Sequence, residues 1–159
     1  MINEDVAAFL ADRMPEVQIL VAENSTATSR QAAAEVGSKV ERIGKSIVFA
    51  SPHSTALVLI SAARRVSRSK LRSLARDDAL KVASPEVVSA RTGYVVGGVA
   101  PFVLPEGVQI FVDIELTTFE TVWISAGSPN SVVELTKGQL RELFAGRLFD
   151  LCEDDTAEA

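Results

Sequence analysis

Residues 46–62 read SIVFASPHSTALVLISA, two apolar runs on either side of a short turn. The runs are Ser46–Ala50 and Ala56–Ala62, and they are joined by a turn with Ser51, Pro52, His53 and Ser54. Short apolar runs bounded by turn residues are typical of buried strands. We therefore predict a buried β-hairpin at the centre of the fold.

Helices and further strands are predicted on both sides of this hairpin. Helices are expected over 3–14, 31–36, around Leu71 and Leu74, from Ser84-Pro85 to Gly93, and from Thr136 to Gly146. Strands are expected over 17–22, up to Val82, and over 108–114, 121–125, 131–135 and 148–151. Thr28 with Gln31, and Thr136 with Gln139, match the capping-box pattern. Leu71 and Leu74 are expected to face inward. The fold class predicted is α/β, with a mixed sheet and packed helices.

The length of 159 residues fits one domain with a core of its own. We predict a single domain over 1–151 and an acidic, mobile tail over 152–159. A single cysteine excludes an internal disulfide and favours a reducing compartment. The first residues do not resemble a signal peptide, and no apolar run reaches the roughly 20 residues of a membrane span. The expected location is cytoplasmic, with no membrane partner.

Charge is distributed unevenly along the chain. Its net value is −5, but four acidic residues lie in the last seven positions, and without them the net charge is −1. No acidic residue interrupts the basic segment, which comprises Arg64, Arg65, Arg68, Lys70, Arg72 and Arg76. Such a segment can neutralise a phosphate backbone. A solvated helix face is the alternative, and charge alone favours it.

His53 and Cys152 are the only histidine and the only cysteine, which excludes a histidine-rich zinc site. His53 is predicted to lie exposed in the turn. A catalytic pair with Ser54 would require an orienting carboxylate and a nucleophile elbow, and the sequence contains neither motif. Cys152 precedes three acidic residues, whose field disfavours a thiolate. Neither residue is a strong nucleophile candidate.

Other candidate positions are ambiguous when taken alone. Residues 92–102 read TGYVVGGVAPF, which is either a plain turn or a loop that lets a ligand approach the backbone and directs N–H groups at an oxyanion. Lys45 is either a solvated strand-end lysine or a contact for a carbonyl, carboxylate or phosphate. Asp113 and Glu115 are weak candidates for paired acid–base work. The loop 125–130 is equally ambiguous.

In combination, these pieces resemble the YbaK/prolyl-tRNA-synthetase-associated domain family of aminoacyl-tRNA deacylases. The resemblance runs from about Thr28 to Leu151. Its parts, in order, are Ala32-Ala33-Ala34, Lys45 before Ile47-Val48-Phe49, Arg65-Val66 before Lys70-Leu71, Thr92-Gly93-Tyr94, Gly97-Gly98-Val99-Ala100-Pro101, Val112-Asp113 and Ala126-Gly127. No single piece is specific, but the ordered combination is.

The resemblance implies a partly barrel-like mixed sheet, an active site in a cleft, and no metal or other cofactor. The residues it implies, together with the basic segment, form three groups. The catalytic group is Lys45, Gly97 and Gly98; the substrate-binding group is Ala100, Pro101, Ser125 and Gly127; and the tRNA-binding group is Arg64, Arg65, Arg68, Lys70 and Arg72.

The function implied is trans-editing, in which the ester of a mischarged, tRNA(Pro)-type tRNA is hydrolysed. The implied partners are the tRNA acceptor end and, as a second candidate, an aminoacyl-tRNA synthetase, with the chain a monomer or a homodimer. A binding module without turnover is the alternative class, and a general esterase is a weaker one. Cysteine-clearing members carry an aspartate where Val132 aligns, and some alanine-clearing members a histidine near Asn130. Neither pattern fits, so the amino acid removed stays open.

Overall fold

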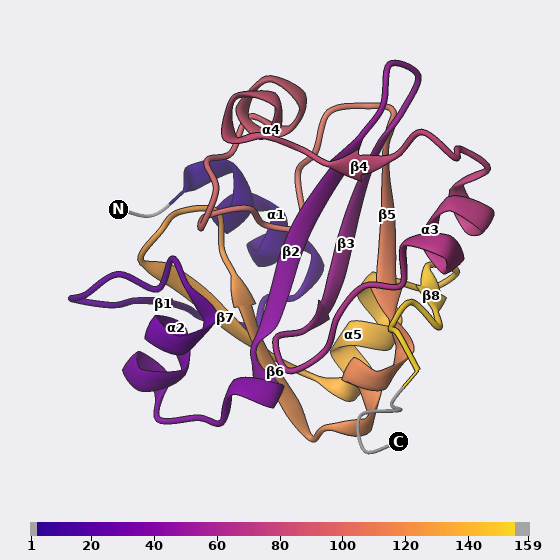
Figure 1. The fold of residues 1–159 in the computed structure, drawn as a ribbon. Helices are drawn as coiled ribbons and strands as arrows, with labels where there is room; N and C mark the ends of the chain where they lie inside the picture. Colours follow the sequence, from indigo (N-terminus) through magenta and orange to yellow (C-terminus); the bar gives the residue numbers. More distant parts are fainter. Residues whose placement is uncertain (1–2, 155–159) are drawn as a thin grey trace.

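The computed structural model describes residues 3–154, and its elements form two β-sheets with helices packed against them (Figure 1). The larger sheet has five strands in the order β4-β2-β3-β5-β8, and the smaller has three in the order β1-β7-β6. The predicted hairpin is confirmed as β2 (Gly44–Ala50) and β3 (Thr55–Ser61), paired antiparallel with Lys45 opposite Ile60.

The remaining strands extend the sheet from this hairpin. β4 (Lys81–Val82) pairs antiparallel with β2, whereas β5 (Val108–Asp113) and β8 (Leu148–Phe149) continue the sheet in parallel from β3. The smaller sheet consists of β1 (Ile19–Val21), β6 (Thr121–Ser125) and β7 (Ser131–Thr136), all antiparallel.

A parallel bridge between Ile43 and Trp123 links the two sheets near the start of β2. The predicted mixed α/β fold is confirmed, and within residues 3–154 the two sheets do not close into a barrel.

The helices begin and end at the polar and glycine signals that the sequence contains. They are α1 (Glu4–Arg13), α2 (Ser29–Val36), α3 (Arg68–Ala75), α4 (Pro85–Thr92) and α5 (Lys137–Leu143), with 3-10 turns η1 (Val40–Arg42) and η2 (Ile114–Thr118). Both predicted capping boxes form, at Thr28 and Thr136. Gly37 and Gly93 end α2 and α4 in the left-handed conformation. None of the helices between residues 3 and 154 is long and apolar enough to cross a membrane.

Alternate residues of β3 contribute to two separate cores, which explains why the strand is apolar throughout. Leu57 and Leu59 join the core formed with α1, α5 and the smaller sheet. Val58 and Ile60 join a second core, which includes Leu71 of α3. All seven residues of β3 are buried.

Two local predictions were wrong. Leu74 is 40% exposed and lies in a shallow hollow beside Phe149, because α3 packs at the margin of its core and only Leu71 is enclosed. The last helix ends at Leu143 instead of Gly146. A turn follows it, in which the Arg147 N–H donates to the Phe144 carbonyl. Of the tail predicted over 152–159, residues 155–159 lie outside the described residues, and Cys152 is buried.

Candidate functional site

A cleft of about 250 Å³ opens where the two sheets meet, between α2, the first residues of β2, β6 and the loop after α4. Ile43, Val99, Ile124 and Val132 form much of its apolar wall. Its polar side chains are Thr26, Thr28, Ser29, Lys45, Ser46 and Ser125. An apolar pocket with a few polar groups is the usual form of a small-molecule site.

Lys45 is placed in this cleft by the close packing of the residue before it. A Cβ atom on Gly44 would lie 2.8 Å from Cγ2 of Ile124 and 3.2 Å from Cδ1 of Leu59. β2 therefore approaches β6 closely at this point, and Lys45 follows at the cleft wall. The Lys45 side chain is half-buried, and no carboxylate among residues 3–154 forms an ion pair with its ammonium group. The charge is therefore available to a ligand.

The glycine loop reaches the other side of the cleft. Gly97 has a φ of +89°, and a Cβ atom there would lie 2.7 Å from Cβ of Ala27. A Cβ atom on Gly98 would lie 2.8 Å from the carbonyl carbon of Ser128. The loop thus packs directly against the segment before α2 and against loop 125–130, at distances only glycine permits.

The two glycines differ in their backbone hydrogen bonding. The Gly98 N–H donates to the Val95 carbonyl at 2.9 Å, so it is engaged within the loop. No hydrogen bond from the Gly97 N–H is found within residues 3–154, and Gly97 lines the cleft. Of the two glycines, Gly97 therefore has the backbone donor that is not engaged, whereas Gly98 packs against the neighbouring loop.

The other residues predicted for the site lie at different distances from the cleft. Ser125 lines it, and its Oγ accepts from the Gly127 N–H at 3.1 Å. Gly127 has a φ of +103° and packs against Asn3 at the start of α1. Ala100 is buried, and Pro101 borders a separate cavity with Phe9 and Phe144. The structure therefore brings Lys45, Gly97 and Ser125 together at the cleft, whereas Gly98, Ala100, Pro101 and Gly127 do not line it.

Sequence reasoning did not select several cleft residues. Ser46 Oγ is the one buried side-chain polar atom in the described part of the chain without a hydrogen-bond partner. Thr28 was identified only as a helix cap, and Trp123 only as part of a strand. The position of Ser46 beside Lys45 was the available signal.

The basic segment begins in the turn after β3 and continues into α3, which packs on the other core and lies on the far side of the larger sheet from α2 in Figure 1. Arg64 pairs with Glu115, and Lys70 Nζ donates to Asp150 Oδ2 at 2.9 Å. Arg72 Nε donates to the Leu80 carbonyl at 3.0 Å. Arg65 and Arg68 are exposed, with no ion pair among residues 3–154.

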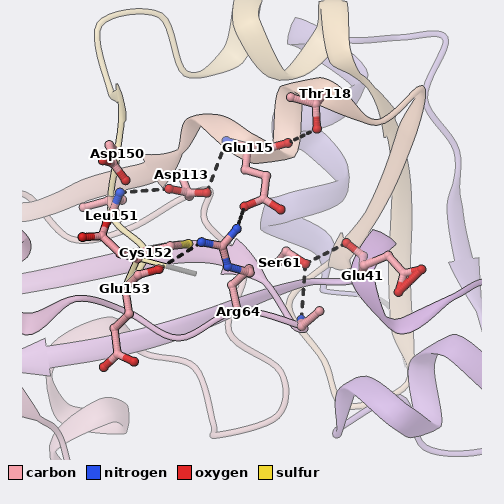
Figure 2. Close-up of polar contacts among 12 residues, drawn as sticks. Glu41, Ser61, Arg64, Asp113, Glu115, Thr118, Asp150, Leu151, Cys152 and Glu153 are labelled. Atoms are coloured by element: carbon pink, nitrogen blue, oxygen red, sulfur yellow. Dashed lines mark hydrogen bonds and ion pairs between the residues drawn. The ribbon is translucent and has the colours of Figure 1, made fainter. Parts of the chain in front are cut away.

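A buried polar cluster fixes the C-terminal segment beside this helix (Figure 2). Asp113 is 2% exposed and accepts from the N–H of Leu151 at 2.9 Å and from that of Glu115 at 3.2 Å. Ligand atoms of Asp113, Glu115 and Cys152 lie within 4.8 Å of one another, but the Arg64 guanidinium already neutralises Glu115. The cluster therefore has a structural role. The Asp113 carboxylate is occupied by two backbone N–H donors, so Asp113 is not suited to acid–base catalysis.

Burial raises the pKa of the Cys152 thiol from its ordinary 9.0 to about 12, and Asp113 adds to the effect. We expect the folded protein to resist thiol-specific labelling at pH 8, and labelling to become fast in denaturant. Between pH 8 and pH 10 the unfolded thiol ionises while the folded one keeps its proton, so stability falls as pH rises. Denaturant titrations at both pH values test this, and Cys152→Ala should flatten the slope. Rapid labelling of the folded protein would contradict it.

The turn between β2 and β3 holds a serine–carboxylate network. Asp77 Oδ2 accepts from Oγ of both Ser51 and Ser54 at 2.5 Å, and these bonds lower the pKa of Asp77. His53 is exposed, as predicted, and no hydrogen bond joins its imidazole to either serine within residues 3–154. Since both hydroxyls donate to a carboxylate, the network stabilises the turn and supplies no histidine-activated nucleophile.

Comparison with known families identifies the domain. The model of the aminoacyl-tRNA editing domain matches residues 23–143, which include the cleft and both of its loops. The chain belongs to this family. The resemblance stated from the sequence is thereby confirmed, and the editing domain is of a kind that acts on the aminoacyl ester of tRNA.

Similar proteins match most of the chain. The "Uncharacterized protein YwhH" of Bacillus subtilis (strain 168) is 34% identical over 134 residues, which are 83% of this chain and 85% of that protein. A structure titled "Crystal structure of a putative trans-editing enzyme for prolyl tRNA synthetase" superposes with a TM-score of 0.84 at 30% identity, covering 95% of this chain and 96% of that one. The "hypothetical protein APE2540" gives a TM-score of 0.85 at 27% identity, covering 93% and 99%.

Proposed function

We propose that this editing domain hydrolyses the ester of mischarged tRNA in trans, with the aminoacyl group held in the cleft. The observation that carries the proposal is the convergence of an unpaired ammonium group, on Lys45, and an unengaged backbone donor, at Gly97, on one cleft. Membership in the aminoacyl-tRNA editing family supplies the ester substrate.

The size and the lining of the cleft limit the side chain that it accepts. Its volume of about 250 Å³ lies below the roughly 300–1,000 Å³ of pockets for drug-sized ligands. Ile43, Ile124 and Val132 give it apolar walls, and no carboxylate lines it. The substrate we propose is therefore an aminoacyl group with a small, uncharged side chain, on a tRNA(Pro)-type tRNA.

The chemistry requires mainly positioning and charge stabilisation, because an aminoacyl ester is already activated. Water adds to the carbonyl carbon, and the ester C–O bond then breaks as a proton of that water passes to the departing ribose oxygen. Attack by the neighbouring ribose hydroxyl alone would only move the ester between the 2′ and 3′ oxygens, so water must complete the reaction. The Lys45 ammonium orients the ester or the terminal phosphate, and the Gly97 N–H donates to the oxyanion. Gly98 keeps the loop in place by its contact with Ser128. With water as nucleophile, the products are the free amino acid and a tRNA with its terminal hydroxyls restored.

The rest of the tRNA is proposed to use the basic segment. Arg65 and Arg68 are exposed and not engaged in ion pairs, so they are the first candidates for phosphate contacts. Arg64, Lys70 and Arg72 would have to exchange their intramolecular partners for phosphates. A synthetase that presents the tRNA is the second proposed partner.

A deacylation panel tests the proposal directly. The purified protein would be incubated with tRNA(Pro) carrying alanine, cysteine, serine or proline, and with other mischarged pairs. We expect release of one small amino acid well above the rate without protein, and little release of proline. Binding of the tRNAs without release of any amino acid would replace the hydrolase with a binding module. Equal hydrolysis of simple activated esters would instead indicate a general esterase.

A further inference from the structure

A second, smaller hollow lies beside the cleft and shares residues of the glycine loop with it. Its volume is about 190 Å³, and its walls come from β2, β4, α4 and the loop. Ile47, Val48, Val82, Ala83 and Val88 line it and do not line the cleft. The hollow is thus a distinct space with its own apolar walls.

The hollow and the cleft share four lining residues. Ser46, Val96, Gly97 and Val99 line both. Ser46 Oγ is the buried polar atom that lacks a partner among the described residues, and it belongs to this shared wall. Whatever occupies the hollow therefore lies next to the group in the cleft, with an unused hydroxyl between them.

The residues that line the hollow indicate what kind of chemical group it can bind. Ser46 is its one polar side chain, and no charged side chain lines it. Val82 and Val96, at its rim, are 49% and 57% exposed, and Val95 next to them is 52% exposed. Such walls suit a flat, uncharged group with apolar faces and not a phosphate. The volume admits one ring system and not a whole nucleotide.

We propose that this hollow binds the 3′-terminal adenine of the tRNA while the aminoacyl group occupies the cleft. This inference rests on the proposed function, because the aminoacyl group is esterified to the ribose of that same nucleotide. The terminal base is therefore the substrate group within reach of the shared wall. Proteins hold the unstacked bases of single-stranded ends by contact with their faces, most often from aromatic side chains. Here valine and isoleucine side chains would supply that contact.

Adenosine 5′-monophosphate, which carries the base without an ester, is the probe for a binding experiment. In an NMR titration of the full chain we expect saturable shifts of the amides of Val48, Val82, Ala83 and Val88. The amides of Thr28 and Trp123, which line only the cleft, should move much less. Shifts confined to the cleft, or no saturable shifts, would overturn the inference.

The matched substitutions are Val82→Glu in the hollow and Val21→Glu on β1, which is 41% exposed and lines neither space. Val82→Glu should weaken binding of the nucleotide at least tenfold and lower kcat/KM for mischarged tRNA by a similar factor. Val21→Glu should change neither value. With a tRNA whose terminal nucleotide lacks its base, the difference between the wild type and Val82→Glu should disappear.

The two experiments separate this inference from the proposed function. Nucleotide binding in the hollow without deacylation of any tRNA would support the base site and refute the hydrolase. Deacylation without shifts in the hollow, and with Val82→Glu as active as the wild type, would support the hydrolase and refute the base site.

Discussion

Lys45→Ala should lower kcat/KM for the preferred mischarged tRNA by at least about 100-fold, the usual effect of removing one preorganised group that stabilises developing charge. Its ammonium group is the cation lining the cleft, and it has no ion pair within residues 3–154 to lose. Thermal unfolding should therefore shift little, by roughly 0.5 kcal/mol or less in free energy. The measurements are single-turnover deacylation and a melting curve on the same samples.

The control for this prediction is Lys39→Ala, which removes an exposed lysine that does not line the cleft. It should be as active as the wild type. Lys45→Arg keeps the charge but replaces a compact ammonium by a planar fork, so partial activity is expected. Full activity of Lys45→Ala would refute the proposed mechanism, whereas a large loss of stability would show that the lysine is structural.

The local elements were predictable because their signals are contained in short stretches of sequence. The hairpin follows from two apolar runs around Ser51–Ser54, and the capping boxes at Thr28 and Thr136 place two helix starts correctly. Leu74 was misplaced because helical spacing from Leu71 says nothing about how wide a face the core covers. The extent of a packed face is a tertiary property.

The site was less predictable, because its parts meet through long-range packing. Lys45 and Gly97 belong to different elements and share a cleft only because β2 approaches β6 and the loop packs on Ala27. Family resemblance, and not spacing, identified the pair. The ion pairs of the basic segment could not be predicted from the sequence either. Arg64 meets Glu115, and Lys70 meets Asp150, only because β3, β5 and β8 pair in parallel.

Gly97→Ala should reduce deacylation at least tenfold and destabilise the fold by about 1–3 kcal/mol. Two effects combine at this position. A φ of +89° costs an alanine roughly 1–2 kcal/mol, and the new methyl group would lie 2.7 Å from Cβ of Ala27. Relief of that contact moves the loop, and with it the N–H donor, away from the cleft. The loss of activity is measured by the rate of deacylation, and the loss of stability by equilibrium unfolding in denaturant.

Gly107→Ala separates conformational strain from collision, because Gly107 has a φ of +96° and no atom lies within 4 Å of the point that a methyl group there would occupy. It should lose stability through strain alone and keep its activity.

Adding Ala27→Gly to Gly97→Ala removes the closest atom, leaving Cα and the carbonyl oxygen of residue 27 at 3.2 Å. We expect the double variant to recover part of the lost activity while retaining the strain. If it recovers none, the contact with Ala27 is not what positions the loop, and the role of Gly97 must lie in its backbone conformation.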